Sequence, residues 1–196
     1  MVYIVFMKVF ITDLGKIIKS SDFFEAHLLT LNLQERNRFE KITNQNRKLQ
    51  FLAGRVLIKN AGIQNAHQTI SGKLVADDVF LSLSHSKNYV MLATDVFPVG
   101  IDIEELNPNR DFQKTANRLN FKTPVDALDF YKMFTQYEAD FKLGKEYKTP
   151  HHRFFVLHGF AVCLSSLKPI DDVSFYEFLP FQASPIDCSS SFCEMD

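Results

Sequence analysis

The sequence contains no tryptophan, few cysteines and almost no net charge. Its three cysteines, Cys163, Cys188 and Cys193, are odd in number and form no C-x-x-C pair, which argues against a disulfide framework and a cysteine-based zinc site. The net charge of −1, from 22 basic and 23 acidic residues, argues against a broad cationic surface. We therefore expect no nucleic-acid partner and no membrane partner.

Targeting and membrane signals are also lacking. The apolar stretch 1–10 is interrupted by Lys8 and is followed by no small-residue cleavage site, so it does not resemble a signal peptide. The apolar stretch 154–164 is too short to cross a bilayer, and it contains His158. These features predict a protein of a reducing cytoplasm.

What the sequence does contain is typical of a globular protein. Of its 196 residues 46% are hydrophobic, and 20 are phenylalanine, enough for a core that needs no metal or disulfide. We expect strands at 2–12, 79–84, 89–94, 99–104 and 154–165, and helices at 111–119 and 125–143. A capped helix is expected to start at 20–26. This order of elements predicts a mixed α+β domain.

The best-defined helix of the chain precedes the three central strands. Its apolar residues recur at helical spacing, and Gly62 provides a stop: Leu49, Leu52, Ala53, Val56 and Leu57. The stretch 36–48 before it is dense in basic and polar residues. After Pro180 the composition becomes polar, which predicts a frayed terminus.

Two carboxylates share one face of the predicted strand 99–104. Side chains alternate along a strand, so Asp102 and Glu104 point the same way, opposite Ile101 and Ile103. Neighbouring like charges repel each other unless a cation or water relieves them. The pattern favours an ordinary strand with its polar face in water, with a cation site as the alternative.

A third carboxylate lies on the predicted helix 125–143. The helix is predicted to bury one stripe, spaced by four, three, four and three residues: Ala127, Tyr131, Phe134, Glu138 and Phe141. A carboxylate on such a stripe must be protonated, paired or bound to a metal. Lys142, one turn further on, is one possible partner of Glu138. Alternatively, Glu138 joins Asp102 and Glu104 around Mg²⁺, or equally Mn²⁺, which makes phosphoryl chemistry the natural reaction class.

Two further segments carry polar groups. Ser84 and His85 end a predicted strand, but neighbours on a strand point to opposite faces and make a poor nucleophile–base pair. His85 is either an ordinary loop histidine or a donor to a phosphate. The loop Ser71-Gly72-Lys73 has the size to hold an anion, although it is not a P-loop.

Taken in chain order, these segments resemble the 4′-phosphopantetheinyl transferases of the surfactin-synthetase-activating type. That family places a glycine–lysine loop before a strand ending in S-H-S, then G-[IV]-D-[IV]-E, then a helix with W-[ST]-x-K-E-[AS]-x-x-K. The matching segments here are Gly72-Lys73, Ser84-His85-Ser86, 100–104 and 134–142. The similarity spans residues 36–178 and includes 51–55 and 159–163.

The resemblance implies a fold and a reaction. The fold has two similar α/β halves, residues 1–97 and 98–180, with the active site in the cleft between them and a polar tail at 181–196. The implied enzyme is a cytoplasmic monomer that transfers 4′-phosphopantetheine from coenzyme A to a serine of an apo acyl or peptidyl carrier protein. The carrier would serve fatty-acid, polyketide or nonribosomal-peptide synthesis, and adenosine 3′,5′-bisphosphate would be released.

The resemblance also implies roles for individual residues. Asp102, Glu104 and Glu138 would hold Mg²⁺ against the pyrophosphate, and Glu138 would be the general base on the carrier serine. Lys142 would steady the transferred phosphate, so the catalytic residues would be Glu138, Lys142 and Asp102. The remaining implied residues bind the nucleotide end of coenzyme A: Arg47, Gly72, Lys73, Ser84 and His85, together with Arg38.

The chain departs from the family pattern at two positions. Phe134 replaces a tryptophan, which can preserve packing, but Tyr137 replaces a lysine and removes a cation expected to face the phosphates. Either another basic residue, such as Lys145, substitutes for that lysine, or the enzyme is slow, or the protein is a non-catalytic homologue that binds coenzyme A or a carrier protein. A further alternative to the transferase is a Mg²⁺-dependent phosphohydrolase that uses the same acids.

Overall fold

The computed structural model of the protein describes residues 7–17, 21–69, 72–121, 126–144, 146–179, 182–185 and 192–194. The chain is a mixed α+β protein, which confirms the class predicted from the order of elements. The described residues form six helices: α1 Leu14–Ile17, α2 Ser21–Leu28, α3 Leu33–Lys41, α4 Gln45–Asn60, α5 Phe112–Arg118 and α6 Ala127–Leu143.

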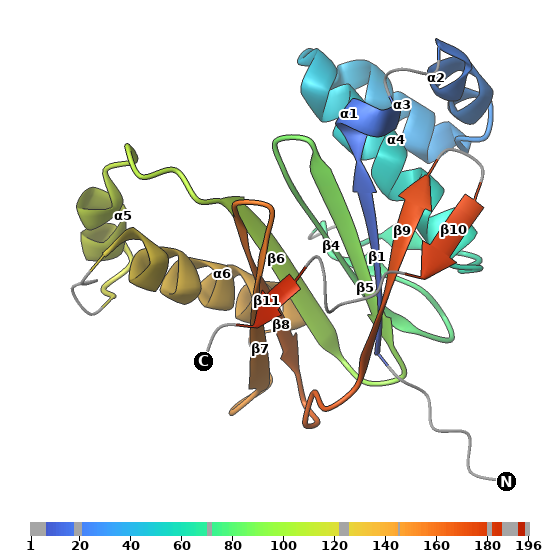
Figure 1. The fold of residues 1–196 in the computed structure, drawn as a ribbon. Coiled ribbons are helices and arrows are strands. Elements are labelled where there is room, and N and C mark those ends of the chain that lie inside the picture. The colour runs from blue at the N-terminus through green and yellow to red at the C-terminus, as the bar shows by residue number, and fades with distance from the viewer. Residues whose placement is uncertain are drawn as a thin grey trace, which may run out of the picture.

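The strands form two main sheets and a small one. The first sheet has the order β10-β9-β1-β5-β4 and consists of Gln182–Pro185, Val173–Leu179, Met7–Asp13, Tyr89–Asp95 and Phe80–Ser86. The second has the order β11-β7-β8-β6 and consists of Phe192–Glu194, His151–Leu157, Phe160–Ser166 and Val99–Glu105. The small sheet pairs β2 His67–Gln68 with β3 Leu74–Val75. Helices α1–α4 lie on the side of the first sheet, and α5 and α6 on the side of the second (Figure 1).

Alternating side chains on the central strands of the first sheet separate two apolar cores. Val9 of β1 and Met91 of β5 pack between the two sheets, whereas their neighbours Phe10 and Leu92 pack against the helices α1–α4. A smaller cluster around Phe130 lies beneath α5 and α6. The strands of the first sheet are therefore buried on both faces, which explains their long apolar runs.

The two main sheets meet along their edge strands, β4 and β6. Three serines of β4 accept backbone N–H groups of β6: Ile101 N to Ser82 Oγ at 3.1 Å, Ile103 N to Ser84 Oγ at 3.3 Å, and Glu105 N to Ser86 Oγ at 3.1 Å. Serine at alternate positions of an edge strand thus replaces the carbonyl partners that a continuous sheet would supply. This serine seam brings the predicted S-H-S strand directly beside the predicted acidic strand.

Several elements agree with the sequence predictions. Helix α4 contains the predicted stripe and is capped by Asn44, whose side chain accepts the backbone N–H of Arg47 at 3.1 Å. The three central strands and helix α5 match their predicted ranges closely. The expected strand 2–12 corresponds to β1, which begins at Met7; residues 1–6 lie outside the described residues.

The predicted strand 154–165 is wrong, because the segment forms two strands. β7 and β8 are joined by a turn in which His158 has φ 46° and Gly159 has φ 85°. Two successive residues of positive φ form the tight turn that matches the twist of a hairpin. Glycine readily adopts a positive φ at the second position of the turn. A histidine at the first position is not a usual turn signal, so the sequence does not predict the hairpin.

The C-terminal region contains strands that the sequence did not predict. β9 pairs in parallel with β1, with Phe175 opposite Val9, although it follows the second sheet in the chain. β10 pairs with β9 and β11 with β7, so parts of the segment expected to be frayed belong to the two sheets. The first sheet is therefore completed by residues from the predicted second half of the chain.

No helix among the described residues is long and apolar enough to cross a membrane.

Candidate functional site

Strand β6 presents its acidic residues to helix α6. Ile101 is buried between the two sheets, so Gly100, Asp102 and Glu104 lie on the opposite face of the strand. A Cβ atom placed on Gly100 would lie 2.0 Å from the carbonyl oxygen of Ala139 in α6. Glycine at position 100 thus allows the helix to approach the strand closely, and the approach brings the side chains of both elements together.

Asp102 is buried at the centre of this contact and is only 4% exposed. The Lys142 ammonium donates to Asp102 Oδ1 at 2.6 Å, to Ser84 Oγ at 2.8 Å and to the carbonyl oxygen of Ile101 at 3.1 Å. Ser84 Oγ in turn donates to Asp102 Oδ1 at 2.8 Å. Lys142 therefore pairs with Asp102 across the two elements, and the pairing with Glu138 that was one expectation is not the one formed.

Burial raises the pKa of each of the other two acids. Burial raises the pKa of Glu104 to about 7, the negative charge of Asp102 adds to the rise, and Arg110 and Lys142 oppose it. Burial also raises the pKa of Glu138, again with a contribution from Asp102. The three acids predicted from the sequence are thus near enough to influence one another.

The chemistry of this acidic set fits a hard cation, although its geometry is not that of a closed metal site. Asp102 Oδ2 is buried and has no hydrogen-bond partner among the described residues, so it remains available as an oxygen ligand. Across the part of the chain that the structure describes, however, no three His, Cys, Asp or Glu side chains converge as a metal-binding group. The positive charge beside Asp102 is supplied by Lys142.

Helix α6 buries a different stripe from the predicted one. Its fully buried face is formed by residues four apart: Tyr131, Thr135, Ala139 and Leu143. Phe141, expected in the core, is 54% exposed, and Glu138 is half-buried at the edge of the stripe. The prediction followed the apolar residues Phe134 and Phe141, and its buried face is therefore shifted by one position. The close approach to β6 instead requires the small or polar side chains of Thr135 and Ala139 at the contact.

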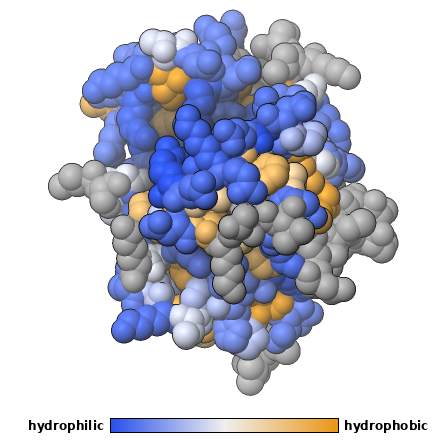
Figure 2. All heavy atoms as spheres, turned by 90° about the vertical axis from the view of Figure 1, so that its left-hand side faces the viewer, coloured by the Kyte–Doolittle hydropathy of each residue, from blue (hydrophilic) through white to orange (hydrophobic). Residues whose placement is uncertain are grey.

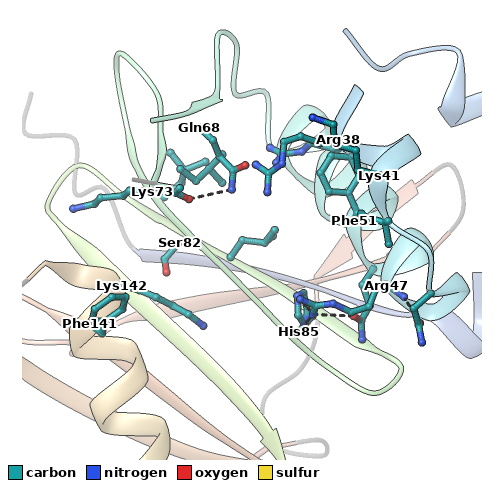
Figure 3. A pocket seen from close by; sticks show the side chains of 18 of the residues that line it. Arg38, Lys41, Arg47, Phe51, Gln68, Lys73, Ser82, His85, Phe141 and Lys142 are labelled. Carbon is teal, nitrogen blue, oxygen red and sulfur yellow. Dashed lines mark hydrogen bonds between the residues drawn. The ribbon is translucent and has the colours of Figure 1, made fainter. Parts of the chain in front are cut away.

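A cavity of about 990 Å³ lies on the other side of Lys142, between α3, α4, β4 and the end of α6. Figure 3 shows Arg38, Lys41, Arg47 and Phe51 on one side of it, Lys142 and Phe141 on the opposite side, and His85 and Ser82 between them. Among the described residues, six cationic side chains and one acidic side chain line the cavity: Arg38, Lys41, Arg47, Arg55, Lys73 and Lys142, against Glu146. Its lining therefore favours an anion of several negative charges.

Most of the residues predicted to bind coenzyme A line this cavity. Arg47, Gly72, Lys73, His85 and Lys142 do so, and so does Arg38. Ser84 does not: it lies beneath Lys142 in the serine seam, and the neighbouring serine of β4 that reaches the cavity is Ser82. Ser82 and Ser84 point to the same side of β4, but the hydroxyl of Ser84 is bonded by Lys142 and Asp102.

His85 is a neutral hydrogen-bond partner of Arg47. The Nη1 group of Arg47 donates to Nε2 of His85 at 2.6 Å. Burial, together with the positive charges of Arg47 and, more weakly, Lys142, lowers the pKa of His85 to about 4. A guanidinium can only donate, so this contact requires a histidine nitrogen that carries no proton.

Lys73 links the small β2–β3 sheet to the end of α6. Its Nζ donates to the carbonyl oxygen of Leu143 at 3.1 Å and lies 3.9 Å from Glu146 Oε1. The preceding Gly72 has φ 87°, and its backbone carbonyl accepts from Gln68 Nε2 at 3.1 Å. This loop therefore forms the wall of the cavity that faces α6, and Lys73 is held at the mouth.

The structure adds cavity residues that were not predicted as ligand contacts. Arg55 of α4 is 6% exposed, lies 3.5 Å from Glu35 and stacks on Phe51, with its guanidinium carbon 4.9 Å from the ring centroid. Burial lowers the pKa of Arg55. The signal available in the sequence was an arginine between apolar residues of the best-defined helix, which would have placed a cation on the buried side of α4.

The two departures from the family pattern have different surroundings. Phe134 stacks on Phe130, with ring centroids 5.6 Å apart, so an aromatic packing role is retained there. Tyr137 is 43% exposed and packs edge-on against Phe121, with centroids 5.7 Å apart. The face that carries α5 and α6 is mostly hydrophilic with a few separate apolar patches (Figure 2). Lys145, the expected substitute, lies outside the described residues.

Comparison of the chain with protein-family models finds no match, and comparison with curated proteins finds none either.

Proposed function

We propose that the protein is a 4′-phosphopantetheinyl transferase that modifies a serine of an acyl or peptidyl carrier protein. The observation that carries the proposal is the cationic cavity, whose lining residue Lys142 also bonds the buried acid Asp102. Coenzyme A carries three phosphates, so it is an anion of the charge and size that such a cavity favours. The two sheets joined at the serine seam support a fold of two halves with the site between them.

The cavity would hold the nucleotide end of coenzyme A. Arg38 and Arg47 would bind its phosphates from the α3–α4 side, and Lys73 from the opposite wall. Neutral His85 would accept from Arg47 and keep that guanidinium directed at the ligand. Lys142 would contact the pyrophosphate, since it lies between this cavity and the three acids.

Asp102, Glu104 and Glu138 would hold Mg²⁺, or Mn²⁺, and the ion when bound would neutralise charge on the pyrophosphate. The unpartnered Oδ2 of Asp102 supports this donor set, and so does the raised pKa of Glu104, which burial causes first and repulsion by Asp102 second. Glu138 is half-buried at the edge of α6, where an acceptor serine could reach it from outside.

The reaction would be an in-line displacement at the phosphorus nearest the pantetheine. Glu138 would accept the proton of the carrier serine while the serine oxygen forms a bond to that phosphorus. The bond from this phosphorus to the bridging oxygen breaks, and adenosine 3′,5′-bisphosphate leaves with the electron pair. Lys142 would steady the charge that develops on the phosphoryl oxygens, which is most of what such a transfer requires.

A second function is favoured by one observation. Lys142 already pairs with Asp102, and Tyr137, which packs on Phe121, occupies the position of the family's lysine, so α6 supplies fewer cations than the family pattern implies. A protein that binds coenzyme A or a carrier protein without transferring the group would need no more than the cavity.

The proposal is tested by intact-mass spectrometry of an apo acyl carrier protein incubated with this protein, coenzyme A and Mg²⁺. We expect a mass gain of one phosphopantetheinyl group. The gain should disappear when the metal is omitted and in the Glu138→Ala variant, while Glu146→Ala, which changes an exposed acid at the mouth of the cavity, should keep it.

The possible results separate the candidate functions. Binding of coenzyme A without any mass gain, on carriers of fatty-acid and synthetase type, would support the non-catalytic binder. Release of phosphate from coenzyme A without a carrier would instead identify a phosphohydrolase. A normal rate in Glu138→Ala would show that the assignment of the base is wrong.

A further inference from the structure

Arg110 lies in an aromatic cage on helix α6. Its guanidinium carbon is 5.5 Å from the ring centroid of Phe130, 5.9 Å from that of Tyr131 and 5.0 Å from that of Phe134. The Tyr131 hydroxyl also donates to the carbonyl oxygen of Asn107 and accepts its N–H, at 3.3 Å and 3.2 Å. The loop after β6 is thus attached to α6, and the position of the Arg110 side chain is set by packing.

The stacked guanidinium keeps its donors available. A guanidinium that lies over aromatic rings uses its flat face for the contact, and its N–H groups point outward at the edge. Among the described residues, no acceptor forms a hydrogen bond with the side chain of Arg110, whose own backbone bonds to Asn107 and Phe112. Glu104 is the acid that interacts with it electrostatically. A half-buried cation with unused donors is typical of a site for an oxyanion.

Arg110 and Lys142 lie on the two sides of Glu138. Phe130, Phe134, Glu138 and Lys142 follow one another at intervals of four residues, so they form one line along the surface of α6. Arg110 covers the first two, Glu138 comes next, and Lys142 is the last and lines the cationic cavity. Arg110 itself is not part of the cavity lining, so a ligand that extends from the cavity past Lys142 and Glu138 would meet Arg110 last.

We infer that Arg110 is a substrate-binding residue that holds the phosphoryl group being transferred, on the side of Glu138 away from the cavity. This inference rests on the proposed function and adds a contact to it. Arg110 then supplies, from a loop, a positive charge that α6 does not supply at Tyr137. The nucleotide phosphates, in contrast, are bound by the cavity residues.

Two ligands distinguish this role, because coenzyme A contains the transferred phosphoryl group and adenosine 3′,5′-bisphosphate does not. We would measure the dissociation constants of both by isothermal titration calorimetry in Mg²⁺ buffer, for the wild type, Arg110→Gln, Arg110→Lys and the matched control Arg118→Gln. Arg118 is exposed on α5, within the same part of the chain. Arg110→Gln should weaken coenzyme A about 10-fold, the effect of one charge-assisted contact, and leave the bisphosphate within about twofold.

Arg110→Lys keeps the charge and should lose less affinity than Arg110→Gln, and Arg118→Gln should lose none. Thermal melting of each variant shows whether it is folded, and Arg110→Lys carries the test if Arg110→Gln does not fold. Equal weakening of both ligands, or of neither, would overturn the inference while leaving the proposed function in place. A rise only in the KM for the carrier protein would assign Arg110 to the acceptor and also overturn it. Failure of the wild type to bind coenzyme A would reject both proposals.

Discussion

Lys142 connects two parts of the site that are distant in the sequence. It forms an ion pair with Asp102 of β6 and a hydrogen bond with Ser84 of β4, 40 and 58 residues away. Its side chain is 26% exposed, whereas that of Asp102 is 6% exposed. The acid is therefore the partner that depends on the pair, because a buried carboxylate without a cation is costly.

We expect Lys142→Met to lower the free energy of unfolding by about 2 kcal/mol, because the substitution leaves the buried Asp102 charge unpaired. The double variant Lys142→Met with Asp102→Asn should recover part of this loss, since the uncompensated charge is then removed. Urea denaturation of the wild type, both single variants and the double variant measures the effect. A double variant less stable than Lys142→Met would show that the pair is not the main interaction of these two residues.

His85 predicts a dependence of stability on pH. Its pKa is about 4 in the folded protein and about 6.5 in an unfolded chain, so below pH 6.5 the unfolded state takes up the proton first. The stability that the folded protein gains from keeping His85 neutral is therefore present above pH 6.5 and is lost as the pH falls towards 4. The loss should amount to about 1–3 kcal/mol of unfolding free energy.

Denaturation curves measured between pH 7 and 4 test this dependence by comparing variants. In His85→Gln the slope over this range should be smaller than in the wild type, and in the control His67→Gln, which alters an exposed histidine, the slope should be unchanged. Equal slopes in the wild type and in His85→Gln would contradict the predicted shift.

At the scale of elements, the contact between β6 and α6 controls the site. Gly100 allows the helix backbone to come within a distance that no side chain would tolerate. Lys142 on one side and Asp140 on another attach the helix to the strands: the Asp140 carboxylate bonds His152 Nε2 at 2.8 Å and accepts from Ser165 Oγ at 2.7 Å. The orientation of Glu138 follows from these contacts.

We expect Gly100→Ala to destabilise the protein by about 3 kcal/mol, because a Cβ atom 2.0 Å from the Ala139 carbonyl oxygen forces α6 away from β6. Thermal or chemical denaturation measures the loss. Gly62→Ala is the matched control: a Cβ there meets no atom within 4 Å, and its φ of 75° costs only about 1–2 kcal/mol. Similar losses in the two variants would mean that the close approach has no special role.

At the scale of the whole molecule, the cavity depends on both sheets and their helices. Arg38 and Arg47 come from the helices over the first sheet, whereas Lys142 comes from the helix over the second. The serine seam between β4 and β6 fixes the two groups of cations relative to each other. After β8 of the second sheet, the chain returns to the first sheet as strand β9. Neither sheet is therefore built from one continuous segment of the chain.

Local patterning was sufficient to predict much of this architecture. The stripe of α4, the three central strands, the range of α5 and the shared face of Asp102 and Glu104 follow from side-chain periodicity and from residues adjacent in the chain. Within the basic stretch 36–48, Arg38, Lys41 and Arg47 line the cavity. Such features depend on short-range geometry, which a sequence encodes directly.

Other features required contacts between distant segments. The partner of Lys142 is Asp102 because α6 crosses β6, and the spacing of four residues to Glu138 could not reveal this. The parallel β9, the hairpin at His158 and the cage around Arg110 likewise depend on which surfaces meet in the folded chain. Periodicity determines which face of an element is apolar, whereas packing between elements determines what each polar group on the other face will touch.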